Sequence, residues 1–440
     1  MKISTMRFLD RLVGIPLCAM LTLWHRAVRL VAREHDAPVR RILFIKLAEQ
    51  GSTVLAVSAI QRAIAMVGRA NVYFMVFEEN RFVLDLMDLI PPENVIAIRA
   101  EGWLGTFANT IAAVRRTRGL RIDAAVDLEF FARSSAALAY LSGAGRRIGF
   151  HGRGAEGPYR GNLMTHRLRY NPHLHTSETF RFMVDAIELD PTDLPAVPFA
   201  PAKTGAEPPP FRPASDELER VRRIVADAAG TESFRPLVLL NANCSDLIPL
   251  RAWPRDRYLV LARRLLASVP DLHIAFTGAP VEGPAAERLV QEIDSPRCFS
   301  LAGRTTLREL LVAFMHADVL VTNDSGPAHF ASLTPIEVVA LFGPEHPSLF
   351  GSRSPRSHIL WAGLACSPCV SALNNRETPC RNNLCMQHIG VDAVHELVLR
   401  LLGEGARAGR SSKVGGAPQP ERAVPLVQVT WPPVGEAIKR

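Results

Sequence analysis

The chain has 440 residues, 48% of them hydrophobic and 21% charged, a balance that is typical of a globular protein and too apolar for general disorder. This length exceeds what one core normally uses, so we expect two domains. The net charge of +8 lies at the ends, because residues 1–41 carry +5, residues 403–440 carry +3, and the remainder has 37 charges of each sign. This distribution argues against an extended nucleic-acid-binding face and favours termini that meet an anionic membrane surface.

The first 37 residues combine an apolar run with arginines. Leu12–Trp24 is free of charge, with Arg7 and Arg11 before it and three arginines after it. The run is shorter than the roughly 20 residues that a spanning helix needs, and no small-residue cleavage site follows it. We therefore expect residues 1–37 to associate with the inner face of the cytoplasmic membrane as an interfacial anchor. The alternative is an ordinary amphipathic helix packed on the body of the protein.

Residues 38–200 read as a first Rossmann-like domain on the acceptor side. An apolar strand at Ile42–Ile45 leads through a turn around Gly51 into a helical pattern. Further strands are expected at Asn71–Phe77, Asn94–Ala100, Asp123–Glu129 and Arg146–Phe150. Strands that alternate with helices predict a doubly wound parallel sheet.

A proline-rich linker at residues 201–213 separates this domain from a second one at residues 214–402. The second domain is expected to begin with a helix that Ser215 caps and that ends at Gly230. Its strands are expected at Pro236–Ala242, His273–Ala279, Asp318–Ser325 and Glu337–Pro344. Residues 403–440 are rich in Gly, Pro, Ser and Arg and are expected to be disordered. The fold class is therefore α/β, with two doubly wound domains whose carboxyl edges face one another across a cleft.

The strongest chemical signal lies after the strand that begins at Asp318. It runs Asn323, Asp324, Ser325, Gly326 and Pro327, with His329 inside the helix that follows. Amides at the start of a helix, next to a glycine that permits close approach, make an anion site suited to a departing diphosphate. The alternative is that Asp324 and Ser325 merely cap the helix.

These motifs resemble glycosyltransferase family 9, the ADP-heptose:lipopolysaccharide heptosyltransferases, which have the two-domain GT-B fold. The resemblance is carried by TNDSGPAHFAS with VALFGP, by residues 40–64, 123–150 and 239–265, and by the cysteine-containing stretch up to Val394. Together these segments cover roughly residues 40 to 400.

The resemblance implies an inverting, metal-independent transfer of a sugar, most simply heptose from ADP-heptose, to a lipopolysaccharide core or related lipid-linked glycan. Asp324, Ser325, Gly326 and His329 would bind the diphosphate and the sugar, and Arg251 would neutralise phosphate charge. No cofactor and no nucleic-acid partner are expected. Two rival functions remain open: a catalytically idle GT-B protein that acts as a scaffold in glycan assembly, and a nucleotide-sugar epimerase.

One position departs from the family pattern. The family places an aspartate, the presumed base, directly after the turn glycine, whereas Gly51 is followed here by Ser52. A serine hydroxyl cannot act as a base near neutral pH, so we expect Glu49 to take that role. Glu129 and Asp127, on one face of a later strand, are the other candidates, and Glu49 as a solvated loop acid is the bland alternative.

Four of the seven cysteines, Cys366, Cys369, Cys380 and Cys385, fall within twenty residues. Their spacing is compatible with a structural tetrahedral zinc ion, and a packed loop of reduced thiols is the alternative. We assign them no catalytic part and expect no metal in the reaction. This cysteine usage does not resemble a secreted disulfide framework, so a reducing cytoplasm is expected.

Overall fold

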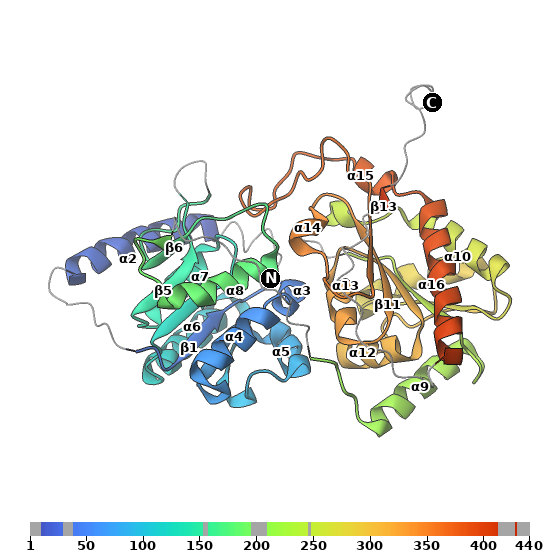
Figure 1. The fold of residues 1–440 in the computed structure, drawn as a ribbon, viewed down its shortest axis with the longest axis horizontal. Coiled ribbons are helices and arrows are strands. Elements are labelled where there is room, and N and C mark those ends of the chain that lie inside the picture. The colour runs from blue at the N-terminus through green and yellow to red at the C-terminus, as the bar shows by residue number, and fades with distance from the viewer. Residues whose placement is uncertain are drawn as a thin grey trace. The chain divides into compact units, whose positions relative to one another are not determined.

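The structure, a computed structural model, describes residues 10–29, 38–152, 157–194, 209–244, 248–411 and 427–428. The chain forms two compact units (Figure 1). Unit 1 comprises residues 1–209 together with two short segments from later in the chain, Ser348–Phe350 and Val370–Thr378. Unit 2 comprises the rest. Most of the linker predicted at residues 201–213 lies outside the described residues, so the predicted domain boundaries stay a prediction.

Unit 1 is built on a six-stranded sheet with the order β3-β2-β1-β4-β5-β6, and its paired strands are all parallel. The strands are β1 (Ile42–Ile45), β2 (Val72–Phe77), β3 (Val95–Ile98), β4 (Ala124–Asp127), β5 (Arg146–Phe150) and β6 (His166–Leu168). The five strands predicted from apolar runs are present, because a parallel strand covered on both faces needs a nearly continuous apolar sequence. β6 was not predicted, since its three residues include His166 and Arg167.

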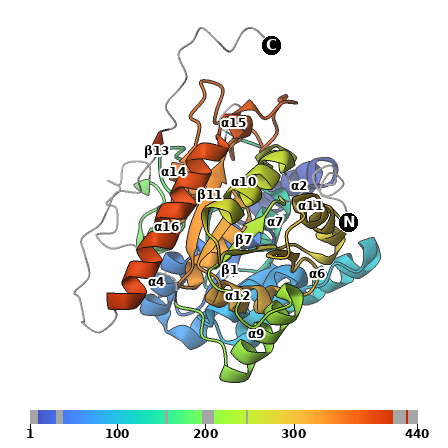
Figure 2. The same ribbon diagram turned by 90° about the vertical axis from the view of Figure 1, so that its right-hand side faces the viewer.

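The helices of unit 1 cover both faces of this sheet. They are α2 (Gly14–Arg29), α3 (Gln50–Val54), α4 (Val57–Val67), α5 (Arg81–Met87), α6 (Gly102–Gly119), α7 (Arg133–Leu141) and α8 (Thr176–Asp185). The strand order reverses at β1, so right-handed crossovers place α4 and α5 on one face and α6 and α7 on the other. α8 packs against α4 (Figure 1), and α2 packs against α7 (Figure 2).

Unit 2 contains a seven-stranded sheet with the order β13-β12-β11-β10-β7-β8-β9, again with parallel pairs. The strands are β7 (Leu237–Asn241), β8 (His273–Phe276), β9 (Cys298–Ser300), β10 (Val319–Asn323), β11 (Glu337–Phe342), β12 (Ser357–Trp361) and β13 (Val427–Gln428). The four predicted strands are β7, β8, β10 and β11. Strands β9, β12 and β13 were not predicted from the sequence.

The helices of unit 2 are α9 (Ser215–Ala229), α10 (Arg255–Ser268), α11 (Gly283–Ile293), α12 (Leu307–His316), α13 (Gly326–Phe330), α15 (Leu384–Gln387) and α16 (Val391–Ser411). A further short helix, α14 (Pro347–Phe350), runs from unit 2 into unit 1. α9 ends before Gly230, whose left-handed φ of 68° confirms the predicted end of the helix. The prediction that Ser215 caps the helix is wrong, because Ala214 stands at the N-cap and Ser215 is the first helical residue. Residues 403–411, which the sequence places in a disordered tail, continue α16.

The predicted N-terminal segment folds as helix α2, although residues 1–9 and 30–37 lie outside the described residues. Its inner face buries Cys18, Leu21 and Thr22 against unit 1, while Leu23 and Trp24 are exposed. The helix is therefore packed on the body along one side, which is the alternative that the sequence analysis left open. In the part of the chain that the structure describes, none of the helices has both the length and the apolar character needed to cross a bilayer.

Candidate active site

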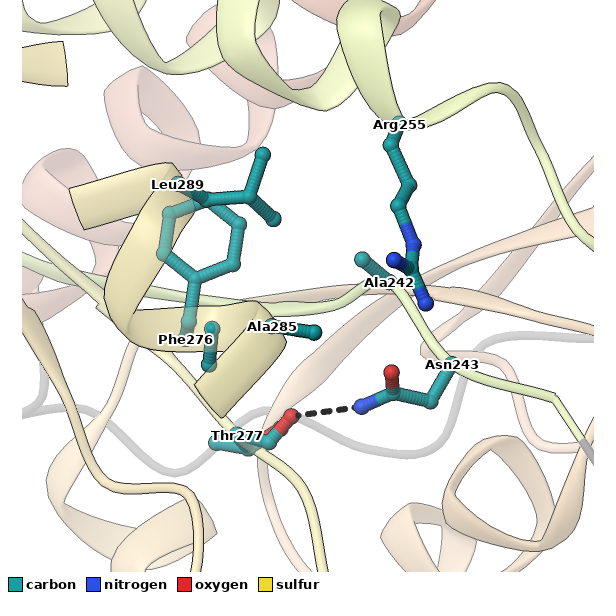
Figure 3. A pocket seen from close by; sticks show the side chains of 8 residues that line it. Ala242, Asn243, Arg255, Phe276, Thr277, Ala285 and Leu289 are labelled. Carbon is teal, nitrogen blue, oxygen red and sulfur yellow. Dashed lines mark hydrogen bonds between the residues drawn. The ribbon is translucent and has the colours of Figure 1, made fainter. Parts of the chain in front are cut away.

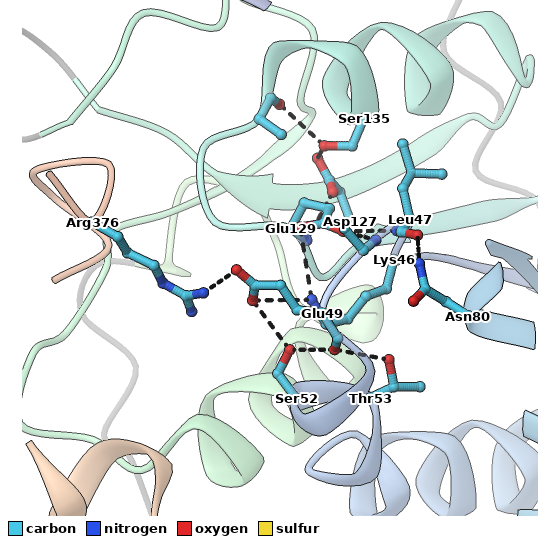
Figure 4. Close-up of polar contacts among 12 residues, drawn as sticks. Lys46, Leu47, Glu49, Ser52, Thr53, Asn80, Asp127, Glu129, Ser135 and Arg376 are labelled. Atoms are coloured by element: carbon cyan, nitrogen blue, oxygen red, sulfur yellow. Dashed lines mark hydrogen bonds and ion pairs between the residues drawn. The ribbon is translucent and has the colours of Figure 1, made fainter. Parts of the chain in front are cut away.

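In unit 1 the candidate site is the turn that joins β1 to α3 (Figure 4). Glu49 sits directly before α3 with φ 66° and ψ 75°, a left-handed conformation that non-glycine residues seldom adopt. Ser52, one turn into the helix, donates its hydroxyl to the Glu49 carbonyl oxygen at 3.0 Å. The same Oγ lies 3.3 Å from Glu49 Oε2. The unusual backbone conformation thus accompanies a carboxylate that folds back onto the side chain of Ser52.

Lys46 and Glu129 lie behind this turn. Lys46 is fully buried, and its Nζ is 3.8 Å from Glu49 Oε2 and 3.7 Å from Glu129 Oε2. Glu129 Oε1 accepts hydrogen bonds from the backbone N–H groups of Leu47 at 2.7 Å and Ala48 at 2.9 Å. Burial raises the pKa of Glu129, and the neighbouring Lys46 opposes this rise. By accepting the two backbone hydrogen bonds from Leu47 and Ala48, Glu129 fixes the backbone of the turn.

Asp127, at the end of β4, is enclosed in a second buried network. It forms an ion pair with Arg160, accepts from Ser135 Oγ at 3.0 Å, and accepts from the Glu129 N–H at 3.1 Å. Burial raises the pKa of Asp127, and Arg160 counteracts this effect. These contacts tie the end of β4 to neighbouring segments. Of the three carboxylates proposed as bases, Glu49 has the most exposed side chain, at 23% compared with 10% for Glu129 and none for Asp127.

An arginine from the later part of the chain completes the unit 1 site. Arg376, in the segment Val370–Thr378 of unit 1, forms an ion pair with Glu49 Oε1. Its guanidinium lies over the rings of Phe130, at 5.5 Å from the centroid, and Phe350, at 5.4 Å. Contact with two aromatic rings restricts a guanidinium, so Arg376 reaches Glu49 from a fixed direction.

In unit 2 the predicted donor residues gather at the carboxyl end of β10. Arg251 Nε is 3.3 Å from Asp324 Oδ2, and Arg251 NH1 donates to the Asp324 carbonyl oxygen at 3.3 Å. Arg251 also forms an ion pair with Glu345, which follows β11 and is 1% exposed. The guanidinium predicted to neutralise phosphate is thus already held by two buried carboxylates.

The residues that follow Asp324 are also close to one another. Ser325 Oγ donates to the Asn323 carbonyl oxygen at 3.1 Å. A Cβ atom on Gly326 would lie 3.1 Å from the Phe330 ring, so packing inside α13 favours a glycine there. Burial lowers the pKa of His329, with Asp324 opposing the change, and this favours the neutral imidazole. α13 has only five residues, and Pro327 has no N–H, so the helix offers fewer amides to an anion than predicted.

The side chain of Asn323, the last residue of β10, connects this strand to the Trp-Pro pair that lies shortly after Arg251. Its Oδ1 accepts from the Trp253 N–H at 2.9 Å and from the Tyr258 hydroxyl at 3.3 Å. Its Nδ2 donates to the Asn243 carbonyl oxygen at 3.0 Å. Trp253 is fully buried and also donates through Nε1 to the Ile389 carbonyl oxygen at 2.9 Å. This network explains how residues more than seventy positions apart place Arg251 beside Asp324.

A small cavity lies at the carboxyl ends of β7, which pairs with β10, and of β8, the next strand in the sheet (Figure 3). One side is apolar, formed by Phe276, Ala285 and Leu289, and the other carries Asn243 and Arg255. Asn243 Nδ2 donates to the Thr277 carbonyl oxygen at 3.2 Å. The cavity therefore lies on the same edge of the sheet as Asp324.

Three residues of the two sites were not predicted from the sequence. Glu345 follows the Phe-Gly-Pro end of β11, so the rule that ligands meet strand carboxyl ends would have included it. Lys46 likewise follows β1, but nothing in the sequence indicates that its side chain is buried beside Glu49 and Glu129. Arg376 is 327 positions from its partner Glu49, and no local pattern indicates that pairing.

The four clustered cysteines of unit 2 range from exposed Cys366 to buried Cys385. Burial raises the pKa of Cys385 to about 11, which favours the protonated thiol. Across the described ranges of the chain, no three or more His, Cys, Asp or Glu side chains are grouped in a way that could hold a metal ion.

Comparisons with known proteins give the family. The family model described as "Glycosyltransferase family 9 (heptosyltransferase)" matches residues 112–378, more than half of the chain. Lipooligosaccharide heptosyltransferase 2 of Haemophilus influenzae is 30% identical over 115 residues, which cover 26% of this chain and 33% of that protein. The enzyme of the same name from Haemophilus ducreyi is 28% identical over 219 residues, which cover 48% of this chain and 59% of that protein. The chain thus matches between a third and three fifths of the length of these two relatives.

The fold is shared with solved structures. The structure of Escherichia coli ADP-heptose lps heptosyltransferase II superposes with a TM-score of 0.62 at 20% identity, and the match covers 83% of this chain and 99% of that one. At this identity the likeness shows the fold, and it confirms the predicted α/β, GT-B class. The matched family model confirms the resemblance seen in the motifs. The chain belongs to glycosyltransferase family 9.

Proposed function

We propose that this protein is an inverting, metal-independent glycosyltransferase that moves heptose from ADP-heptose to a lipopolysaccharide core or related lipid-linked glycan. Membership of family 9 supports the transfer chemistry, and the names of the relatives supply the sugar, the nucleotide and the class of acceptor. Because those relatives are matched over only part of their length, the donor and the acceptor both belong to the proposal.

The observation that carries the proposal is the position of the Glu49 carboxylate against the hydroxyl of Ser52, at 3.3 Å. The family motif places its aspartate where Ser52 stands. Here a carboxylate supplied from three residues earlier reaches the same side chain. A group that serves as base needs access to its substrate, and among the three candidate carboxylates Glu49 has the largest exposed fraction.

In the proposed reaction Glu49 takes the proton from an acceptor hydroxyl. At the same time the oxygen of that hydroxyl attacks the anomeric carbon of the donor sugar. The bond between that carbon and the diphosphate oxygen breaks, the electron pair leaves with ADP, and the configuration inverts. Glu49 ends the step protonated. Lys46, Ser52 and Arg376 fix the position of the carboxylate on three sides, which reduces the cost of orienting the base.

On the donor side the diphosphate is proposed to lie at the start of α13, with Ser325 and Gly326 beside it and His329 within reach of a phosphate or sugar oxygen. Arg251 supplies the positive charge that the departing diphosphate needs. Asp324 and Glu345 hold that guanidinium, so a phosphate oxygen that arrives at this place competes with two carboxylates for it. Donor binding should therefore depend on Glu345 as well as on the predicted residues.

The lipid-linked acceptor implies a protein that works at the inner face of the cytoplasmic membrane as a peripheral component. The four arginines among residues 11–33, without any Asp or Glu, suit an anionic lipid surface. No nucleic-acid partner is proposed, because the central part of the chain has no net charge.

Titration calorimetry with ADP tests the donor assignment, and replacement of Glu49 tests the base. We expect ADP to bind the wild type, and we expect Glu49→Gln to lose transfer by about 10²-fold or more with ADP affinity unchanged. Glu78→Gln, which changes an exposed glutamate of the same unit, is the matched control. Failure to bind ADP or any other nucleoside diphosphate would refute the donor assignment.

The second candidate function is a catalytically idle scaffold, and Ser52 at the family's aspartate position favours it. That reading predicts a wild type without transfer on every plausible donor and acceptor, although ADP still binds. An epimerase, the third reading, would interconvert the sugar of the donor with no acceptor present.

A further inference from the structure

The start of the N-terminal segment is held at the beginning of α7. Ala132 stands at the N-cap of this helix, and an alanine side chain cannot accept a hydrogen bond. Asp10 supplies the acceptor instead, because its Oδ1 accepts hydrogen bonds from the Arg133 and Ser134 N–H groups, each at 3.0 Å. Its Oδ2 is 3.1 Å from Nη1 of Arg133, a side chain that is only 7% exposed. A buried arginine and two helix amides therefore fix the position of Asp10.

Packing holds the next turn of the segment at the same place. A Cβ atom on Gly14, the first residue of α2, would lie 2.7 Å from Arg133 Cβ, so this close approach requires a glycine. Cys18 Sγ donates to the Arg133 carbonyl oxygen at 3.7 Å. Arg11 lies between Asp10 and Gly14 in the sequence. Its backbone is therefore held on both sides, although its side chain is 55% exposed.

The side chain of Arg11 extends from this support to the turn that carries Arg376. Its Nη2 is 3.1 Å from both Oε1 and Oε2 of Glu377, the residue directly after Arg376. The pair joins residues that are 366 positions apart, and both belong to unit 1. Successive side chains of the turn thus contact two charged partners, since Arg376 pairs with Glu49 and Glu377 pairs with Arg11.

The turn itself is closed by internal hydrogen bonds. The Ser371 N–H donates to Asn374 Oδ1 at 2.9 Å, the Arg376 N–H donates to the Ser371 carbonyl oxygen at 2.9 Å, and the Glu377 N–H donates to the Asn374 carbonyl oxygen at 3.0 Å. Asn375 and Arg376 both have a left-handed backbone, with φ of 54° and 57°, which non-glycine residues seldom adopt. Because these bonds connect the two halves of the turn, a displacement of Glu377 would move Arg376 with it.

The supports of this turn stand on one connection, the chain between β4 and the first turn of α7. Phe130, whose ring centroid is 5.5 Å from the Arg376 guanidinium, belongs to it, and so does Arg133, which holds Asp10. Glu129, which fixes the backbone before α3, belongs to it as well. The base, the arginine that orients the base and the N-terminal residues that contact the turn of that arginine therefore share one scaffold.

We propose that Arg11 and Glu377 are positioning residues for the transfer reaction. Arg11 holds Glu377, and the closed turn passes this restraint on to Arg376, which orients the carboxylate of Glu49. The inference rests on the proposed function, because it takes Glu49 as the base. It gives the start of the N-terminal segment a part in the transfer step, besides the contact with lipid that is proposed for this segment. An exposed ion pair contributes a factor of about two to five, so the effect on kcat should be of that size.

Transfer to a water-soluble acceptor fragment tests this role in the absence of lipid. Arg11→Gln and Glu377→Gln should each lower kcat by about two- to fivefold, with the KM for ADP-heptose unchanged. In the Arg376→Gln background Arg11→Gln should have no further effect, because the arginine through which it acts is gone. The exchanged pair Arg11→Glu/Glu377→Arg should recover at least half of the lost rate. Arg115→Gln, at an exposed arginine of α6, is the control and should turn over like the wild type.

Hydrogen exchange of the full chain gives a readout that needs no transfer. The N–H groups of Arg376 and Glu377 are hydrogen-bonded inside the turn, so they exchange slowly while the turn is held in place. We expect Arg11→Gln to speed the exchange of a peptide covering residues 371–378 by several-fold. Arg115→Gln should leave the exchange of this peptide unchanged.

The outcomes separate this inference from the proposed function. Unchanged exchange in Arg11→Gln would overturn the positioning role, and so would an undiminished effect of Arg11→Gln on kcat in the Arg376→Gln background. A Glu49→Gln variant that transfers sugar like the wild type would instead refute the base. The positioning role would fall with the base in that case, even where exchange of the turn still depends on Arg11.

Discussion

Lys46 offers the most demanding test of the electrostatics at the turn, and Lys46→Met is the perturbation. The ammonium is fully buried between Glu129 and Glu49, at 3.7 and 3.8 Å. Two unit charges roughly 4 Å apart interact by about 4 kcal/mol at an effective dielectric constant of 20. Removing one partner of a buried pair costs about 3–5 kcal/mol, because the other charge is left uncompensated. At 2–4 °C per kcal/mol for a domain of this size, Tm should fall by about 6–20 °C.

The loss should depend on pH. Burial raises the pKa of Glu129 above its ordinary value of 4.5, so its contribution to stability is fully present below that value. This contribution of Glu129 to stability is lost as pH rises through its folded-state pKa, because the buried carboxyl then becomes charged. In the wild type the positive charge of Lys46 reduces the cost of that buried negative charge. We therefore expect the Tm difference between wild type and Lys46→Met to be largest near neutral pH and to shrink in acid.

Differential scanning fluorimetry across pH provides the assay, with Lys46→Met/Glu129→Gln as the matched control. The glutamine keeps an oxygen that accepts from Leu47 and Ala48 N–H, but removes the charge. The double variant should recover at least half of the lost Tm. A Tm difference that is independent of pH, with no recovery in the double variant, would show that lost packing rather than lost charge causes the effect.

Three further predictions concern the reaction. Arg376→Gln should lower kcat by about tenfold or more with ADP affinity unchanged, because Glu49 loses a partner that orients it. The control Arg381→Gln, at an exposed arginine five positions later in the sequence, should leave steady-state rates unchanged. Equal effects of the two variants would refute a positioning role for Arg376. Glu345→Gln should tighten ADP binding by several-fold in calorimetry, because it removes a carboxylate that competes with phosphate for Arg251. Weaker ADP binding by this variant would mean that phosphate does not approach Arg251. Transfer should survive dialysis against EDTA, and a rate restored only by added divalent metal would contradict the metal-independent mechanism.

The fold was largely predictable because buried parallel strands appear in the sequence as apolar runs. β1 reads Ile-Leu-Phe-Ile and is buried throughout, and β10 is equally clear. β6 and β9 have three residues each, too few for any pattern to stand out. Strand β13 lies in a stretch whose composition indicates disorder, so only its pairing with β12 reveals it.

The candidate site was predictable only where its residues are local. The left-handed turn at Glu49 places a carboxylate against Ser52, and the two are close enough in sequence for that relation to be proposed. Arg376 reaches Glu49 through tertiary packing of a segment from the far end of the chain. Likewise, no local pattern reveals that Arg251 would be shared between Asp324 and Glu345, since that depends on three different loops.

The central claim is that the Glu49 carboxylate serves as the base, the role that the family gives to an aspartate at the position of Ser52. The most direct measurement is the rate of ADP release from ADP-heptose, with lipid acceptor present, by Glu49→Gln and by Glu49→Gln/Ser52→Asp. The account predicts that the single variant is nearly inactive and that the double variant regains at least about tenfold, because a carboxylate returns within a few ångströms of the lost one. A single variant that turns over like the wild type, or a double variant that binds ADP normally and recovers nothing, would contradict it.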